Sequence, residues 1–474
     1  MPTPRLLHLL PSLLPLVMLG CDTTYAWHGD LTPPDLSMDE ATPNGGTEET
    51  GDAPVDTGDA EAPDFSHLPV FVITTEAKVP LGRQVGGTLA VIEDHDGTLS
   101  DLAAAPRAFT GAIGIALEQS GSGPQDKKSY ALACRDAAGG DTDCALAGLP
   151  AATDWVLYAP LADKTYMRNA LAFDLARTIA MPAGRWEPRT AFVEVVRDGT
   201  YDGVYLLIER VTAEADRLDL SETVDAETGA ADGGFIVKVD GQRGPGFTTE
   251  AGTPVDYSWP DADGVPEASA YVAGWFDGFE AALLGPNFAD RAFGYAAWID
   301  VDAWVDTFLL NELSGNVDAY RLSAYLWADG PPGVGKLRAG PIWDVDRGFG
   351  NADYCNGYSP VGWIADNLAT CAHTAEIPVW WARLREDPAF EQRVRGRWSL
   401  LRDGALSDEA LSQRVTTMQA RTAEAEVRDH ARWPVVGTRV YPNAYVGASW
   451  ADEVAWFQKW TLDRAAWMDG ALSD

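Results

Sequence analysis

The chain has 474 residues, of which 46% are hydrophobic and eighteen are Trp, so it holds enough apolar surface for a large folded body. Its formal net charge is −36, because it contains 71 Asp and Glu but only 35 Lys and Arg. Nucleic acids and anionic lipid surfaces repel such a chain, so neither is expected as a partner. The same negative charge would attract a basic protein, although it also promotes solubility.

The N-terminus has the pattern of an export signal. Arg5 precedes an apolar stretch, Leu6–Leu19, that is too short to span a bilayer. Gly20 directly before Cys21 resembles a bacterial lipobox, whose cysteine is lipidated after cleavage; an ordinary signal peptide is the alternative. Residues 1–20 are therefore predicted to be a signal peptide. We expect a lipoprotein on the extracytoplasmic side of the bacterial envelope, attached to the membrane only by its lipid, or else a secreted protein.

An acidic segment follows the signal. Twelve acidic residues lie from Asp22 to Asp64, and no Lys or Arg occurs from Asp22 to Ala77. Pro, Thr and Gly fill much of the rest. Such a segment cannot bury enough apolar surface to fold, so residues 21–66 are predicted to be a disordered linker.

The remaining elements follow in an order that predicts the fold class. Strand-like runs, separated by turn residues, are PVFVITT, GTLAVIED, GAIGIALEQ, SYALACRD, AFVEVVRD, GVYLLIER and GGFIVKVD. Helical patterns cover Asp163–Ala180, Glu267–Leu284, Trp298–Leu313 and most of the chain after His373. This order predicts an α+β protein with two lobes. Its mainly β N-lobe would span about 67–250 and its mainly α C-lobe about 251–474.

Two pairs of polar residues are candidates for a metal and phosphate site. Asn316 and Asp318 follow the helix expected to end at Leu313, and Asp344 and Asp346 follow GPIW, a short apolar run that could be a strand. On a strand, residues two apart point to the same face. Carboxylate and amide oxygens are the hard ligands that Mg²⁺ takes beside phosphate and water. The alternative is that each pair caps a turn.

Four segments carry a resemblance to a known family. They are FLLNELSGNVDAY, KLRAGPIWDVDRGFGN, DWVLYAPLADKTYMRNALAFDLAR and GVYLLIERV. They resemble the spore-coat CotH kinase family of atypical secreted protein kinases, and the similar region would span 67–474. The resemblance implies a two-lobed, protein-kinase-like fold. The resemblance implies transfer of the γ-phosphoryl group of ATP to Ser or Thr of an extracytoplasmic protein, with Mg²⁺ or Mn²⁺ as cofactor. It also implies that Asp318 acts on the acceptor hydroxyl and that Asp344 binds the metal, assisted by Asn316 and Asp346.

The nucleotide-binding residues are expected upstream. Lys127 and Lys128 follow SGSGPQD, a loop whose backbone N–H groups could cradle phosphates; the alternative is a solvated surface pair. The family pattern has Arg-Gly where this chain has Glu118 and Gln119, and Asp126 would repel phosphate. These departures leave open a second reading, a non-catalytic surface adhesion or scaffold protein with the same fold.

Three further charged residues stand out in the sequence. Arg168 matches a family arginine and would bind phosphate, or else form an ion pair with a carboxylate such as Glu209. Glu209 lies where a kinase has its interlobe hinge, so it is expected near the adenine. Lys238 lies in the apolar run FIVKVD, where it could equally be an edge-strand charge.

Four cysteines remain after Cys21. An even number in an exported protein predicts disulfides, and pairing of sequence neighbours gives Cys134–Cys144 and Cys355–Cys371; free buried thiols are the alternative. The second bridge would clamp the segment in which a kinase has its activation loop, so a fixed site is expected.

We expect the protein to be a monomer.

Overall fold

The computed structural model describes residues 64–93, 100–101, 107–118, 127–241, 244–260, 266–371 and 376–473. These residues belong to one folded unit, Thr57–Asp474. The expected signal peptide, Cys21 and the linker up to residue 63 lie outside the described residues. Phe65 and Ser66 form the short strand β1, which pairs with β4 (Ser100–Asp101).

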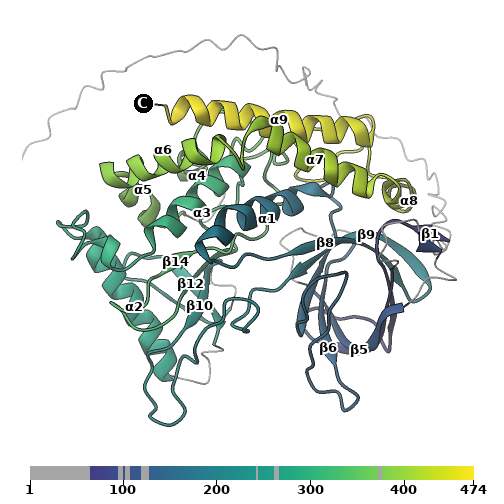
Figure 1. Cartoon of the computed structure of the whole chain (residues 1–474), viewed down its shortest axis with the longest axis horizontal. Coiled ribbons are helices and arrows are strands. Elements are labelled where there is room, and N and C mark those ends of the chain that lie inside the picture. The colour runs from purple at the N-terminus through teal and green to yellow at the C-terminus, as the bar shows by residue number, and fades with distance from the viewer. Residues whose placement is uncertain are drawn as a thin grey trace, which may run out of the picture. The chain divides into compact units, whose positions relative to one another are not determined.

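Seven strands close into a barrel in the order β2-β3-β5-β6-β7-β9-β8 (Figure 1). They are β2 (Val70–Thr75), β3 (Val85–Ile92), β5 (Arg107–Leu117), β6 (Tyr130–Arg135), β7 (Asp154–Tyr158), β8 (Thr190–Arg197) and β9 (Thr200–Glu209). Neighbouring strands are antiparallel except β2 and β8, whose parallel pairing closes the ring. Because side chains alternate along a strand, every second residue, such as Phe71 and Ile73, packs into the barrel core.

A second sheet has the order β11-β12-β10-β13-β14. Its strands are β10 (Phe235–Val239), β11 (Gly246–Thr248), β12 (Pro254–Trp259), β13 (Ala324–Ala328) and β14 (Arg338–Ala339). Strand β10 lies between β12 and β13, so Lys238 is on an interior strand. The interpretation of Lys238 as an edge-strand charge is therefore wrong.

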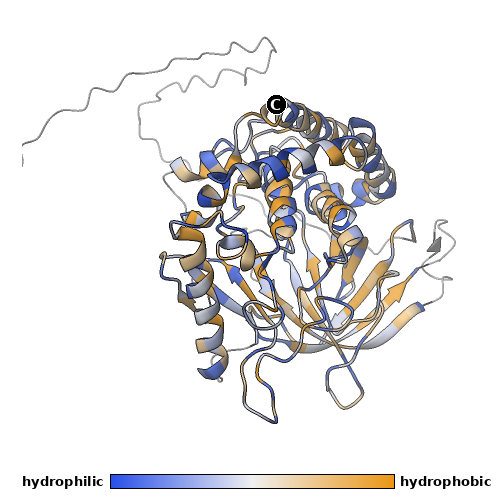
Figure 2. Ribbon diagram, turned by 60° about the vertical axis from the view of Figure 1, so that its left-hand side comes forward, coloured by the Kyte–Doolittle hydropathy of each residue, from blue (hydrophilic) through white to orange (hydrophobic). Residues whose placement is uncertain are grey.

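The helices pack together over a large apolar core (Figure 1). They are α1 (Met167–Ala180), α2 (Pro266–Leu284), α3 (Val301–Ser314), α4 (Ile364–Thr370), α5 (Val379–Arg385), α6 (Pro388–Arg402), α7 (Asp408–Thr422), α8 (Ala425–Arg432) and α9 (Trp450–Ala471). Figure 2 shows helices that mix hydrophobic and hydrophilic residues, as expected for one buried and one solvated face. Trp304, Trp380 and Trp460 are fully buried, so they act as core residues. In the described part of the chain, no helix is both long enough and apolar enough to cross a membrane.

The expected two-lobed, kinase-like fold is wrong. The N-terminal strands form a closed barrel, and a second sheet joins the helices. This sheet takes β10 from before residue 250 and β12, β13 and β14 from after it, so strands and helices do not separate into a β lobe and an α lobe. The physical reason is that strand periodicity reports which face is buried, whereas closure depends on a pairing between β2 and β8, which are more than a hundred residues apart.

Candidate functional site

The turn after α3 brings the two predicted polar pairs together. Helix α3 begins at Asp300, whose side chain accepts a hydrogen bond from the N–H of Ala303, and it ends at Gly315 in the left-handed region at φ 57°. Directly after it, the side chain of Asn316 accepts from the N–H of Asp318 at 3.1 Å and donates to the carbonyl of Asp344 at 3.3 Å. The Asn316 side-chain amide thus connects the two pairs, although they are far apart in the sequence.

Asp344 and Asp346 lie in a loop rather than on a strand, so the expectation that they share a strand face is wrong. Strand β14 ends at Ala339, and Asp344 adopts the left-handed conformation at φ 55°. The carboxylate of Asp346 is buried and accepts from the Tyr158 hydroxyl at 3.0 Å. No described residue pairs with the carboxylate of Asp344. A non-glycine residue held in this backbone conformation is the kind of strain that gathers at functional sites.

The site carries an excess of negative charge. Burial, and then the neighbouring carboxylates of Asp346 and Asp318, raise the pKa of Asp344 well above its ordinary value. Burial also raises the pKa of Asp346, and the nearby Arg347 opposes that shift. Asp318 forms ion pairs with Arg347 at 3.1 Å and with Arg321 at 4.0 Å. Crowded carboxylates of this kind favour a bound cation or proton.

The hard oxygen donors fit a divalent cation that has few protein ligands. Within the described residues, no three His, Cys, Asp or Glu side chains converge closely enough to hold a metal ion by themselves. A cation here would therefore depend on Asp344, with Asn316 and Asp346 nearby, and on oxygens from phosphate and water. This is the usual way in which Mg²⁺ is bound beside nucleotides.

Asp344 faces a cavity of about 110 Å³. One part of its lining is apolar and includes Val156, Phe173 and Ile208; the charged lining residues are Glu118, Arg210, Lys238, Asp240 and Asp344. An open hollow of about 550 Å³ shares Glu118, Arg210, Lys238 and Asp240 with this cavity. Apolar walls beside charged groups suit a ligand that has both an aromatic ring and a charged tail.

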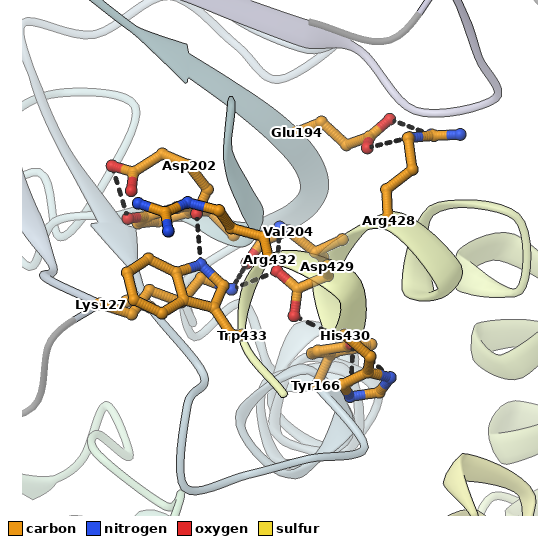
Figure 3. Close-up of polar contacts among 12 residues, drawn as sticks. Lys127, Tyr166, Glu194, Asp202, Val204, Arg428, Asp429, His430, Arg432 and Trp433 are labelled. Carbon is orange, nitrogen blue, oxygen red and sulfur yellow. Dashed lines mark hydrogen bonds and ion pairs between the residues drawn. The ribbon is translucent and has the colours of Figure 1, made fainter. Parts of the chain in front are cut away.

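Lys127 does not line this cavity. Its side chain is fully buried, and its ammonium group contacts the Asp429 carboxylate at 2.6 Å and the Val204 carbonyl at 2.7 Å (Figure 3). Asp429, from α8, also accepts from the Val204 N–H at 2.7 Å and from the Tyr166 hydroxyl at 3.1 Å. Lys128 is partly buried, and its carbonyl accepts from Tyr205. Nucleotide binding by either lysine stays a prediction.

Arg168 and Glu209 have separate partners. The guanidinium of Arg168 pairs with Asp163 at 2.6 Å and donates to the carbonyl of Gly348 at 3.2 Å, which ties the start of α1 to the loop that follows Asp346. Glu209 pairs with Arg189 at 2.7 Å. Neither Arg168 nor Glu209 is among the described lining residues, although Ile208 and Arg210 on either side of Glu209 are. Their roles toward a nucleotide also stay predictions.

Sequence reasoning missed Arg210 and Asp240 as residues of the cavity and left Lys238 undecided. One signal was available: Lys238 and Asp240 are two residues apart in FIVKVD, so strand periodicity places them on one face. That this face opens into a cavity depends on the packing of the sheet against the barrel, which the sequence does not display.

Both predicted disulfides are confirmed. Cys134 pairs with Cys144 and Cys355 with Cys371, with Cα–Cα distances of 6.2 and 5.3 Å. Arg321 lies 4.0 Å from the sulfur of Cys355 and 4.0 Å from the carboxylate of Asp318. The second disulfide therefore abuts the polar site.

Comparison with known families identifies the chain. A family model described as CotH kinase protein matches residues 117–468. The matched range includes the residues that line the cavity and both polar pairs. No curated protein matches the chain at a significant level.

Proposed function

Because the chain belongs to the CotH kinase protein family, we propose that it is an exported protein kinase that transfers the γ-phosphoryl group of ATP to Ser or Thr of an extracytoplasmic protein. The observation that carries the proposal is Asp344, whose backbone is left-handed and whose carboxylate has no partner among the described residues; it lines a cavity together with Lys238 and Arg210. Family membership and the two disulfides fit an extracytoplasmic protein. The lipid anchor at Cys21 is part of the same proposal.

The chain's own residues divide the work of the transfer. Asp344 would hold Mg²⁺, with Asn316 and Asp346 beside it. A bound Mg²⁺ would neutralise charge on the phosphates. The acceptor hydroxyl oxygen forms a bond to the γ-phosphorus, its proton passes to the carboxylate of Asp318, and the bond from the γ-phosphorus to the departing ADP oxygen breaks. Arg347, paired with Asp318 at 3.1 Å, keeps that carboxylate in position.

The direct test is transfer of radiolabelled phosphate from ATP to a mixture of envelope proteins. Asp318→Asn and Asp344→Asn should each lower the transfer about a hundredfold or more, because each removes a charge that acts on the reacting groups. Asp302→Asn is a matched control, since Asp302 is exposed on α3 and pairs with the exposed Arg393. Equal transfer by the wild type and both site variants, with folding verified by circular dichroism, would show that these residues do not catalyse the reaction.

The second candidate is a non-catalytic surface adhesion or scaffold protein. The observation that favours it is the burial of Lys127 against Asp429, which withdraws that ammonium group from any ligand. It requires that the wild type transfers nothing and that ATP with Mg²⁺ leaves the melting temperature unchanged. A ligand at a hundred times its Kd would instead add about 2.7 kcal/mol of stability, so the two functions are separable in one melting experiment.

A further inference from the structure

A nucleotide triphosphate in the cavity needs a cation from the protein. The lining already holds the carboxylates of Glu118, Asp240 and Asp344, and phosphates would add several negative charges. Like charges in a partly buried site repel strongly unless cations intervene. Of the described lining residues, Lys238 and Arg210 carry positive charge.

Lys127, the lysine that the sequence pattern favoured, is occupied elsewhere. Its ammonium group has one contact to Asp429 and one to the Val204 carbonyl, and it lies 5.1 Å from the centre of the Tyr205 ring. Its side chain has no solvent exposure. Moving it toward a ligand would leave Asp429 buried without its cation, which is costly.

Lys238 has the opposite character. It lies on β10, an interior strand hydrogen-bonded on both sides, so its backbone is rigid. Its side chain is 29% exposed, and its ammonium group pairs with the buried carboxylate of Asp240 at 2.8 Å. Asp240 in turn accepts a hydrogen bond from the N–H of Ser323. The residue before it, Leu322, donates its N–H to the carbonyl of Asp318. This chain of contacts links Lys238 to the residue expected to act on the acceptor.

Arg210 is a weaker candidate for the same role. It leaves the end of β9 on the barrel wall, and its guanidinium pairs with Glu118. The ammonium group of Lys238 has three N–H donors and its side chain is partly exposed, so it can bind a phosphate oxygen while it stays paired with Asp240.

We propose that Lys238 is the residue that binds the phosphates of ATP, and that Asp240 positions its ammonium group. The assignment rests on the proposed kinase function. It replaces Lys127 in that role and gives Lys127 the structural task of joining α8 to the barrel.

Calorimetric titration with Mg·ATP and, separately, with adenosine tests the assignment. Lys238→Met should weaken the binding of Mg·ATP about ten- to a hundredfold, which is the loss of one charge-assisted hydrogen bond, and should leave adenosine binding unchanged. Lys238→Arg should retain most of the affinity for Mg·ATP because it keeps the charge. Lys459→Met is the control, since Lys459 is an exposed residue of α9 that pairs with Asp463.

The outcomes separate the assignment from the function on which it rests. Undiminished Mg·ATP binding by Lys238→Met, or an equal loss for Mg·ATP and adenosine, would overturn the role of Lys238 and leave the kinase proposal standing. A wild-type protein that binds no nucleotide would overturn both.

Discussion

Individual residues in this protein take their chemistry from burial more than from sequence context. Asp344, Asp346 and Glu312 are ordinary acidic residues in the sequence, and burial raises the pKa of each in the structure. Glu312 is a structural anchor. It accepts from the N–H groups of Ile364 and Ala365 and pairs with Arg464 at 3.0 Å.

Glu187 allows a test of this effect through pH. Burial raises its pKa to about 8, although it accepts a hydrogen bond from the N–H of Ile342. Between the unfolded value of 4.5 and about 8, the folded protein binds a proton that the unfolded chain does not. The contribution of Glu187 to stability is therefore fully present below pH 4.5 and is lost as the pH rises toward 8.

Glu187→Gln removes this titration. The free energy of unfolding of the variant, minus that of the wild type, should increase as the pH rises from 5 to 8.5. The increase should reach up to roughly 1.4 kcal/mol for each unit by which the pKa is shifted. Urea unfolding of both proteins at the two pH values measures the difference. A difference that is the same at both values would show that Glu187 is charged in the folded protein.

At the scale of elements, α8 acts as a clamp on the outside of the barrel. Three of its side chains reach the barrel in Figure 3: Arg428 pairs with Glu194 of β8, Asp429 binds Lys127 and the backbone of Val204, and Arg432 donates to the carbonyl of Tyr201. The N-cap residue of α1, Tyr166, joins the same cluster through Asp429. One short helix thus ties the start of α1 to β8 and β9.

Removing the charge of Asp429 should loosen this clamp. Asp429→Asn leaves the ammonium group of Lys127 buried without a counter-charge, which we expect to cost about 3–5 kcal/mol of unfolding free energy. Val427→Ala, on the exposed side of the same helix, should change it by no more than about 0.5 kcal/mol. Urea unfolding at neutral pH compares the two, and a loss no larger than that of the control would contradict the clamp.

At the scale of the whole molecule, the N-terminal pattern predicts export and attachment to the membrane. The proposed lipid on Cys21 precedes the predicted acidic linker, 21–66, whose random-coil reach would be about 35–40 Å. That distance would hold the folded unit away from the membrane while leaving it free to meet proteins on the same surface. The acyl chains of the proposed lipid would supply the attachment, at about 0.8 kcal/mol per buried methylene group.

Cys21→Ser tests the anchor. Without the cysteine, no lipid can be added, so the protein should appear in the soluble fraction or retain an uncleaved signal. Fractionation of cells followed by mass measurement of the N-terminal peptide distinguishes these results from the parent protein. If the variant is cleaved and still fractionates with membranes, the protein is not a lipoprotein.

Local pattern sufficed for those features of this protein that depend on near neighbours. The alternation in PVFVITT and GVYLLIER predicted strands, the spacing of apolar residues predicted helices, and the disulfides joined cysteines only 10 and 16 residues apart. Family motifs also marked Asn316, Asp318, Asp344 and Asp346, which the structure brings together through one amide hydrogen bond.

Only the tertiary structure decided what depends on distant pairing. The parallel contact between β2 and β8 closes a barrel in place of the expected N-lobe, since strand periodicity carries no information about partners. The same holds for charged side chains, since Lys127 and Lys238 are both lysines in or beside strands. Lys127 is buried against the carboxylate of Asp429, which is 302 residues away in the sequence. The side chain of Lys238, on an interior strand beside a cavity, stays partly exposed. A charged side chain is defined by what surrounds it, and those surroundings come from remote parts of the chain.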